Sequence, residues 1–583
     1  MRILSVLVAT AALFAATAPA AAASRADWDA CKGDDDLDRS IAACTRIIQG
    51  RGDTAKDSAI AHHERGLSYK SKGDFDRAIA DFTEAIRLDP KYAEAYYIRG
   101  VAYGNKGDLD RAIADYSEAI RLDPKLAAAY INRGNAYKNR GDFDRAIADL
   151  SEAIRLDPKS AVAYNNRGSA YAFRGDIDRA IADFSASIGL EPKVPTVHYN
   201  RGKLYQLQGN NDRAIADFSE AIRLDPNFVP AYNGRGSAYL GNGDKERAVT
   251  DFNEAIRLDP KFADAYSNRA TAHFLQGHNE RAIADFSEAI RLDPKLASAY
   301  NNRGNAYGAR GNTGRAIADF DEAIRLEPKY AVAYNNRGSV YLRQGRIAPA
   351  IADFDEAIRL DPKLVFAYGN RGHAYRVRGN IGRAVADLSE AIRLEPKFVF
   401  AYVDRGDAYR ARGDNDHAIA DYSEAIRLEP KFADAYYSRG LAYLYCGTLD
   451  KALADVSKAS ELDPHDAYKA VWADIVAQHN HVDGRLSQAS AKIDMTPWPA
   501  PIIRMYLGRM PPDAVLAAAD DPDAKKKKSQ LCQANFYSGE WALRMGAKDE
   551  AVRLFRLAAS GCAKDVDESF AANAELKALG SAP

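Results

Sequence analysis

The sequence predicts an all-α protein, a right-handed superhelix of stacked helical hairpins with a helical cap at each end. Three observations predict it: a proline recurs every 34 residues, each unit holds two stretches with helical apolar spacing, and a glycine separates the stretches. At 583 residues the chain is too long for one compact core, which a growing array does not need. The prolines, each preceded by Leu-Asp or Leu-Glu, are Pro90, Pro124, Pro158, Pro192, Pro226, Pro260, Pro294, Pro328, Pro362, Pro396, Pro430 and Pro464.

The prolines and the composition divide the chain into four segments. We expect a signal peptide over 1–23, a degenerate hairpin that caps the array over 24–58, twelve tandem repeats over 59–466, and a C-terminal helical domain over 467–583. The repeat pattern resurfaces inside the last segment and predicts a final degenerate hairpin at 532–565.

The first segment has the layout of a secretory signal. Arg2 is followed by an apolar stretch that ends in Ala21-Ala22-Ala23, before a polar sequence. This predicts an exported bacterial protein, periplasmic or secreted, without a stable membrane anchor; the alternative is an uncleaved anchor. A bacterial lipoprotein has a leucine followed by small residues immediately before its lipid-attachment cysteine. Here Trp28-Asp29-Ala30 precedes Cys31, so we expect no lipid anchor.

One repeat shows the logic of all twelve. Gly107 is expected to end the first helix in the left-handed conformation, and Asp108 to cap the second. Pro124 then ends the second helix and starts the next repeat.

The pattern resembles the tetratricopeptide repeat, a helix-turn-helix of this length. The family's small residue on the first helix is glycine from Gly66 to Gly440, with Ala270 the exception, and its small partner on the second helix is always alanine, from Ala78 to Ala452. The repeat with Ala270 is therefore the expected weak joint. Each repeat also carries an arginine before the small residue and an aspartate on the second helix. We expect the two to pair; the alternative is an arginine whose head group lies in water.

The resemblance implies that the first helices line a concave groove. Immediately before the arginine stands an asparagine in seven repeats, and a row of carboxamides pairs readily with the backbone of an extended chain. These predicted peptide-binding residues are Asn132, Asn166, Asn200, Asn268, Asn302, Asn336 and Asn370. The alternative is that a uniform array copied one polar residue. Variable neighbours such as Tyr437, His373 and Asp407 are expected to supply selectivity.

Five cysteines accompany the predicted export, which favours disulfides. Cys31 and Cys44 fall on the two helices of the N-terminal cap, and Cys532 and Cys562 fall at the two extremities of the final hairpin. We predict both pairs as disulfides, with free thiols as the alternative for the first. Cys446 is left over and is expected to pack as a small apolar group.

The C-terminal segment, with Trp498-Pro499 and Tyr506-Leu507-Gly508, resembles the bacterial cell-envelope lipoprotein NlpI and related alphaproteobacterial repeat proteins. The resemblance implies a periplasmic adaptor that docks peptidoglycan-remodelling or proteolytic enzymes.

Other functions find little support in the sequence. Lys and Arg number 80 against 81 Asp and Glu, so no basic field points at nucleic acid, and the run Lys525 to Lys528 is expected in a solvated loop. No phosphate loop, zinc-protease motif or nucleophile elbow occurs, and His479 with His481 lacks a third metal ligand. We therefore predict a non-enzymatic scaffold for a protein or peptide partner, without cofactor or metal. The alternatives are an enzyme hidden in the tail, with the array as its recruiting arm, and a self-assembling structural protein.

Overall fold

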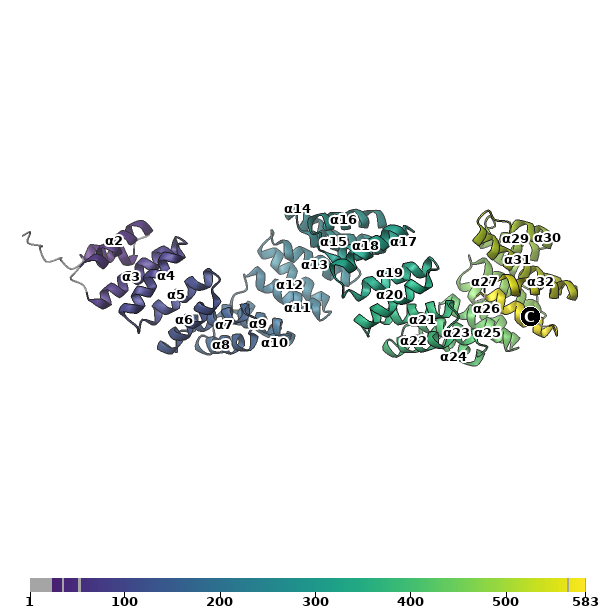
Figure 1. Cartoon of the computed structure of the whole chain (residues 1–583), viewed down its shortest axis with the longest axis horizontal. Coiled ribbons are helices and arrows are strands. Elements are labelled where there is room, and N and C mark those ends of the chain that lie inside the picture. Colours follow the sequence, from purple (N-terminus) through teal and green to yellow (C-terminus); the bar gives the residue numbers. More distant parts are fainter. Residues whose placement is uncertain (1–23, 34–35, 51–53, 564–565, 582–583) are drawn as a thin grey trace, which may run out of the picture. The chain divides into compact units, whose positions relative to one another are not determined.

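The computed structural model describes residues 24–33, 36–50, 54–563 and 566–581, so the predicted signal peptide lies outside the described residues. The described chain is all-α, without a strand, and its helices stack as successive antiparallel hairpins (Figure 1). The predicted fold class is therefore confirmed. The chain forms two compact units, Met1–Gln276 and Gly277–Pro583, divided inside the repeat that carries alanine in place of glycine.

The first unit begins with the cap hairpin and continues with repeats. Its helices are α1 (Arg25–Gly33), α2 (Leu37–Gln49), α3 (Ala55–Ser71), α4 (Phe75–Leu88), α5 (Ala93–Asn105), α6 (Leu109–Leu122), α7 (Ala127–Asn139), α8 (Phe143–Leu156), α9 (Ala161–Arg174), α10 (Ile177–Leu190), α11 (Pro195–Leu207), α12 (Asn211–Leu224), α13 (Val229–Gly241), α14 (Lys245–Leu258) and α15 (Ala263–Leu275).

The second unit holds further repeats and the C-terminal helices. Its helices are α16 (Asn279–Leu292), α17 (Ala297–Ala309), α18 (Thr313–Leu326), α19 (Ala331–Arg343), α20 (Ile347–Leu360), α21 (Val365–Val377), α22 (Ile381–Leu394), α23 (Val399–Ala411), α24 (Asn415–Leu428), α25 (Ala433–Tyr445), α26 (Leu449–Leu462), α27 (Ala467–His479), α28 (Leu486–Ala489), the 3₁₀ turn η1 (Ser490–Lys492), α29 (Ala500–Tyr506), α30 (Pro512–Ala518), α31 (Ala524–Arg544), α32 (Lys548–Gly561) and α33 (Asp567–Ala578).

The predicted glycine turn forms in each of the twelve repeats, from Gly73 to Gly447. Gly107 has φ of 80°, a conformation that an L side chain rarely adopts, and the Asp108 side chain accepts a hydrogen bond from the Arg111 amide at 3.1 Å. The turn thus satisfies an amide at the start of α6 that has no partner within the helix.

The glycine of the first helix lies against the large side chain of the second. A Cβ built on Gly406 would lie 2.6 Å from Cε1 of Tyr422, and one on Gly66 would lie 2.6 Å from Cε1 of Phe82. Both rings are fully buried. Any larger residue at these glycines would therefore overpack the hairpin.

The arginine before that glycine pairs with the aspartate of its own hairpin, which is one of the two predicted alternatives. We call this two-pronged contact the arginine clamp. On α23, Nε and Nη2 of Arg405 donate to both carboxylate oxygens of Asp421, and Nη1 donates to Oγ of Ser389 in the preceding repeat at 2.9 Å. The same two-pronged arginine–aspartate contact recurs in eleven repeats, at 2.7–2.9 Å. The alternative of a solvated head group is wrong, because these arginines join helices within and between repeats.

Both ends carry a pair of bonded cysteines. Sγ of Cys31 lies 2.11 Å from Sγ of Cys44 across α1 and α2, and Sγ of Cys532 lies 1.98 Å from Sγ of Cys562 across α31 and α32. In the second unit, α27 and α31 share a large core around Trp472, which stacks on Phe536.

Two expectations about the C-terminal half need correction. The run Lys525 to Lys528 is exposed as expected, but it lies in the first turns of α31, because Asp523 caps that helix. Cys532 lies inside this helix, which begins at Ala524. Cys446 is exposed, since it occupies the C-cap position of α25, which other repeats fill with exposed polar residues such as Lys106 and Arg140.

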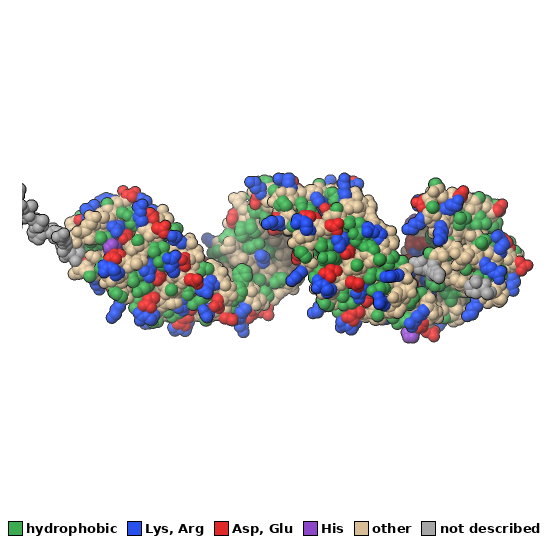
Figure 2. Space-filling model, in the orientation of Figure 1, with side chains coloured by type: hydrophobic (Ala, Val, Ile, Leu, Met, Phe, Trp, Pro, Cys, Tyr) green, Lys and Arg blue, Asp and Glu red, His purple; other side chains and the backbone are tan. Residues whose placement is uncertain are grey.

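The visible surface of each unit mixes both signs of charge (Figure 2). Many of these charges are neighbours on one second helix, such as Glu424 and Arg427 at 2.6 Å. Within the described residues, no helix combines the length and the apolar character that crossing a membrane requires.

Candidate functional site on the inner face

The first helices of the repeats form the inner face of each unit. Successive first helices contact one another directly, as α11 does with α13 and α19 with α21, whereas successive second helices have at most marginal contacts. The stack is therefore tighter on the side of the first helices. Any ligand held along that side meets the side chains of those helices.

The asparagine row lies on this face, with all seven side chains half-buried, but part of it already binds the chain itself. Nδ2 of Asn370 donates to Oδ1 of Asn335 at 2.9 Å and to Oγ of Ser339 at 3.1 Å, both in the preceding repeat. Similar bonds between repeats start from Asn132, Asn268 and Asn336. The repeat pattern does not reveal this seam of hydrogen bonds between repeats. The seam occupies amide donors and leaves the carbonyl oxygens of Asn132, Asn268 and Asn370 without a partner among the described residues.

The other three asparagines are used differently. Oδ1 of Asn166 and Oδ1 of Asn302 each accept a bond from the asparagine immediately before them, at 3.4 and 3.0 Å. Asn200 has no side-chain hydrogen bond to any described residue.

A larger site lies at the C-terminal end of the second unit. A cavity of about 1110 Å³ opens between the first helices α21, α23 and α25 and the C-terminal helices α27, α31, α32 and α33. It includes Asp407 and Tyr437, two of the residues expected to give selectivity. No row asparagine lines it.

Arg410 is one of the charged residues that line the cavity. Its side chain is 8% exposed, and its Nη2 donates to Oδ1 of Asp567 on α33 at 2.6 Å. Nε and Nη1 of Arg410 are buried without a hydrogen-bond partner, as is Nε of Arg376, which occupies the equivalent position one repeat earlier. Buried donors without an acceptor are costly, so an acceptor oxygen placed beside these nitrogens would be stabilising.

Other cavity residues titrate abnormally for clear reasons. Burial raises the pKa of Asp407, against the opposing charges of Arg410 and Arg376. Burial also raises the pKa of Glu568 to about 7, and the same cause holds the pKa of Tyr437 well above its usual range. Lys469 is already satisfied by Asp434, Asp463 and Asp466. Nη2 of Arg376 lies 3.4 Å from Asp404, and Nη2 of Arg410 lies 3.7 Å from Asp407. The unmet demand of the two arginines is therefore confined to their buried nitrogens without a hydrogen bond.

Sequence reasoning missed the pair Arg376 and Arg410. The sequence does mark this position as exceptional. Arginine occupies it in two consecutive repeats only, and the other repeats have small, apolar or different polar residues there. The signal alone does not reveal burial, which depends on α33 packing over the face.

Known proteins resemble the chain in the repeats. Models of the tetratricopeptide repeat match residues 63–127, 116–148, 161–194, 195–228, 233–297, 301–364, 367–398 and 433–466, and a TPR repeat model matches 134–173 and 406–447. Together these matches span more than half of the chain.

Several solved structures are similar to parts of the chain. MamA is 32% identical over 28% of this chain and 96% of its own, with a TM-score of 0.27. A tetratricopeptide repeat protein from Parabacteroides merdae is 25% identical over 42% and 98%, with a TM-score of 0.37. Yeast Tom70 is 17% identical over 73% and 99%, with a TM-score of 0.36. Since all three scores are below 0.5, these likenesses carry no argument about function.

The glycine–aromatic contacts, the 34-residue hairpins and the matched models agree with one another. The chain belongs to the tetratricopeptide-repeat family.

Proposed function

We propose that the protein is an interaction scaffold whose inner face holds an extended segment of a partner protein. The observation that carries the proposal is the cavity of about 1110 Å³ with its buried, unpaired Arg410. A fold that needed this arginine only for its own stability would pair all of its nitrogens, as Arg405 does on the same helix.

The partner segment presents an acidic group to the cavity. A guanidinium binds a carboxylate through parallel N–H bonds, and two of the three nitrogens of Arg410 are free for it. Tyr437 and Tyr468 line the same cavity and offer ring surface to the apolar part of the segment.

The asparagine row extends the proposal along the inner face. Because its amide donors largely serve the seam between repeats, the row would offer the carbonyl oxygens of Asn132, Asn268 and Asn370 to backbone N–H groups of the guest. Such hydrogen bonds involve the backbone of the guest and not its side chains. Selectivity for the guest sequence would therefore come from the cavity.

We also propose that the protein works in the bacterial cell envelope, as an adaptor for peptidoglycan-remodelling or proteolytic enzymes. The two cysteine pairs at bonding distance support an oxidising compartment. The resemblance of the C-terminal segment to cell-envelope repeat proteins supports the kind of partner. N-terminal sequencing of the protein from its native host tests export: a mature chain that begins near Ser24 is expected, and an intact Met1 contradicts it.

Site-specific photo-crosslinking tests the interaction site. A photoreactive side chain at Asn573, which lines the cavity, is expected to crosslink one partner segment in cells, with an acidic residue near the crosslink. The matched control places the same group at Arg427, an exposed position on a second helix.

Arg410→Gln in the Asn573 crosslinking background should reduce the crosslink at least tenfold, whereas Arg412→Gln, an exposed change just after the same helix, should not. Equal crosslinking from Asn573 and Arg427, or a crosslink that survives Arg410→Gln, would overturn the proposal.

A further inference from the structure

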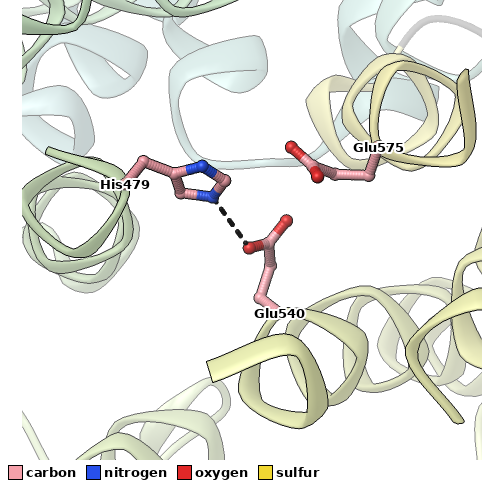
Figure 3. A group of neighbouring side chains, drawn as sticks. All are labelled: His479, Glu540 and Glu575. Carbon is pink, nitrogen blue, oxygen red and sulfur yellow. Dashed lines mark hydrogen bonds and ion pairs between the residues drawn. The ribbon is translucent and has the colours of Figure 1, made fainter. Parts of the chain in front are cut away.

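Three side chains from three C-terminal helices meet away from the cavity. His479 is the last residue of α27, Glu540 lies on α31 and Glu575 lies on α33. One ligand atom of each lies within 4.8 Å of the others, and the three side chains point toward one another (Figure 3). Nε2 of His479 lies 3.2 Å from a carboxylate oxygen of Glu540.

The group is unusual because two carboxylates share it with one imidazole. Glu540 is 4% exposed, and within the described chain no lysine or arginine forms an ion pair with either glutamate. The buried carboxylate of Glu540 and the half-buried carboxylate of Glu575 repel each other, and one histidine does not neutralise both. The fold thus keeps a negative site that a cation would satisfy.

The titration of the group agrees with this geometry. Burial, and then the neighbouring Glu540 charge, raise the pKa of Glu575 to about 7. The hydrogen bond to Glu540 raises the pKa of His479 against the effect of burial.

We propose that His479, Glu540 and Glu575 bind a divalent transition-metal ion of the zinc class. One imidazole nitrogen and two carboxylate oxygens are a ligand set that zinc uses, with bonds of roughly 2.0–2.2 Å and a fourth position for water. Calcium and magnesium prefer oxygen ligands alone, so the imidazole disfavours them. The ligand atoms, up to 4.8 Å apart, would have to move closer together to reach such bond lengths.

The site links a metal to the packing of α33. Glu575 lies on the same helix as Asp567 and Glu568, which line the cavity. A metal bound by α27, α31 and α33 would hold α33 in place over the inner face. Zinc is therefore expected to protect the α33 backbone amides from hydrogen exchange.

Calorimetric titration of the metal-free, tag-free full chain with ZnCl₂ at pH 7.5 tests the site. We expect one equivalent to bind with micromolar or lower Kd, and CaCl₂ to give no saturable heat at the same concentration. Substituting CoCl₂ should give the visible absorption bands of four- or five-coordinate cobalt, which a purely electrostatic site would not.

Variants assign the ligands. Glu575→Gln keeps the shape of the side chain and should weaken zinc at least tenfold, and His479→Gln should do the same. His481→Asn, two residues away and exposed, is the matched control and should bind zinc like the wild type. Far-UV circular dichroism confirms that each variant is folded. Absence of saturable zinc binding by the wild type, or equal affinity in folded Glu575→Gln, would overturn the proposal.

Discussion

Arg405 and Arg410 lie on the same helix, α23, and both are largely buried, yet their surroundings differ. Every nitrogen of Arg405 donates a hydrogen bond within the chain, two to Asp421 and one to Ser389. Arg410 reaches Asp567 through one nitrogen and leaves two unpaired. The first arginine belongs to the repeat pattern and holds the array together, whereas the second departs from the pattern and faces the cavity. The difference directs the search for interaction sites in a uniform array to positions where one repeat departs from the others.

Arg405→Ala should give the largest effect on stability. It leaves the carboxylate of Asp421, 7% exposed, without its two-pronged partner, and removing one member of a buried pair costs about 3–5 kcal/mol. Urea unfolding followed by circular dichroism measures the loss. Arg427→Ala, which breaks an exposed pair with Glu424, should change the free energy of unfolding by less than ~0.5 kcal/mol. Equal effects of the two substitutions would contradict the clamp.

Glu568→Gln tests how the stability of the cavity region depends on pH. The Glu568 carboxyl lines the cavity beside Asp567, Tyr537 and Gln533. Burial raises its pKa to about 7, so the stabilising protonated form is fully present below about pH 4.5 and is lost as pH rises through 7. The glutamine stays neutral, so at pH 8 the variant should be more stable than the wild type by roughly 2–3 kcal/mol, and at pH 4.5 equally stable.

Thermal denaturation at both pH values measures the difference between Glu568→Gln and the wild type. Glu424→Gln, an exposed control, should show no such rise. A Glu568→Gln variant that gains nothing at pH 8 would mean that the carboxyl is not buried as described.

Gly406→Ala tests the packing that the repeat dictates. The added Cβ would lie 2.6 Å from the ring of Tyr422, so we expect a loss of roughly 1–3 kcal/mol in urea unfolding. Gly382→Ala on α22, where nothing lies within 4 Å and φ is not positive, should be neutral or stabilising by up to about 1 kcal/mol. If Gly382→Ala lowered the free energy of unfolding more than Gly406→Ala, the close packing of Gly406 against Tyr422 would be contradicted.

Asn370→Ala gives the smallest expected effect. It removes the bonds to Asn335 and Ser339, and a net loss of about 0.5–1.5 kcal/mol should appear in thermal unfolding. Asn200→Ala, which removes no described bond, should leave stability unchanged. If both variants keep full stability, the seam between repeats contributes nothing and the row is left for ligands alone.

Much of the fold follows from the sequence because each unit repeats a local pattern. The glycine turn at Gly107, the cap at Asp108 and the close approach at Gly66 depend on residues within one hairpin, so spacing alone predicts them. The cysteine pairs were accessible for the same reason. Cys446 was misjudged because the cap position of a helix, not the residue type, decides its exposure.

The candidate sites were much less predictable. The cavity depends on the contact of Arg410 with Asp567, 157 residues later, and no periodicity reports a contact of that range. His479, Glu540 and Glu575 likewise come from three helices with no shared motif. The proposed peptide-binding role of the asparagine row stays a prediction, since its seam hydrogen bonds do not exclude a guest on the remaining carbonyls.

The spacing of the arginine clamp allows the number of repeats to change during evolution. Each arginine contacts an aspartate 16 residues later and, in most repeats, a hydroxyl 16 residues earlier, as Arg405 does with Asp421 and Ser389. Deleting or duplicating a whole number of 34-residue blocks by unequal recombination would keep the arginine at the same spacing from both positions. The gene can therefore gain or lose whole repeats without creating a new kind of contact between neighbouring repeats. The length of the array can then differ between related proteins.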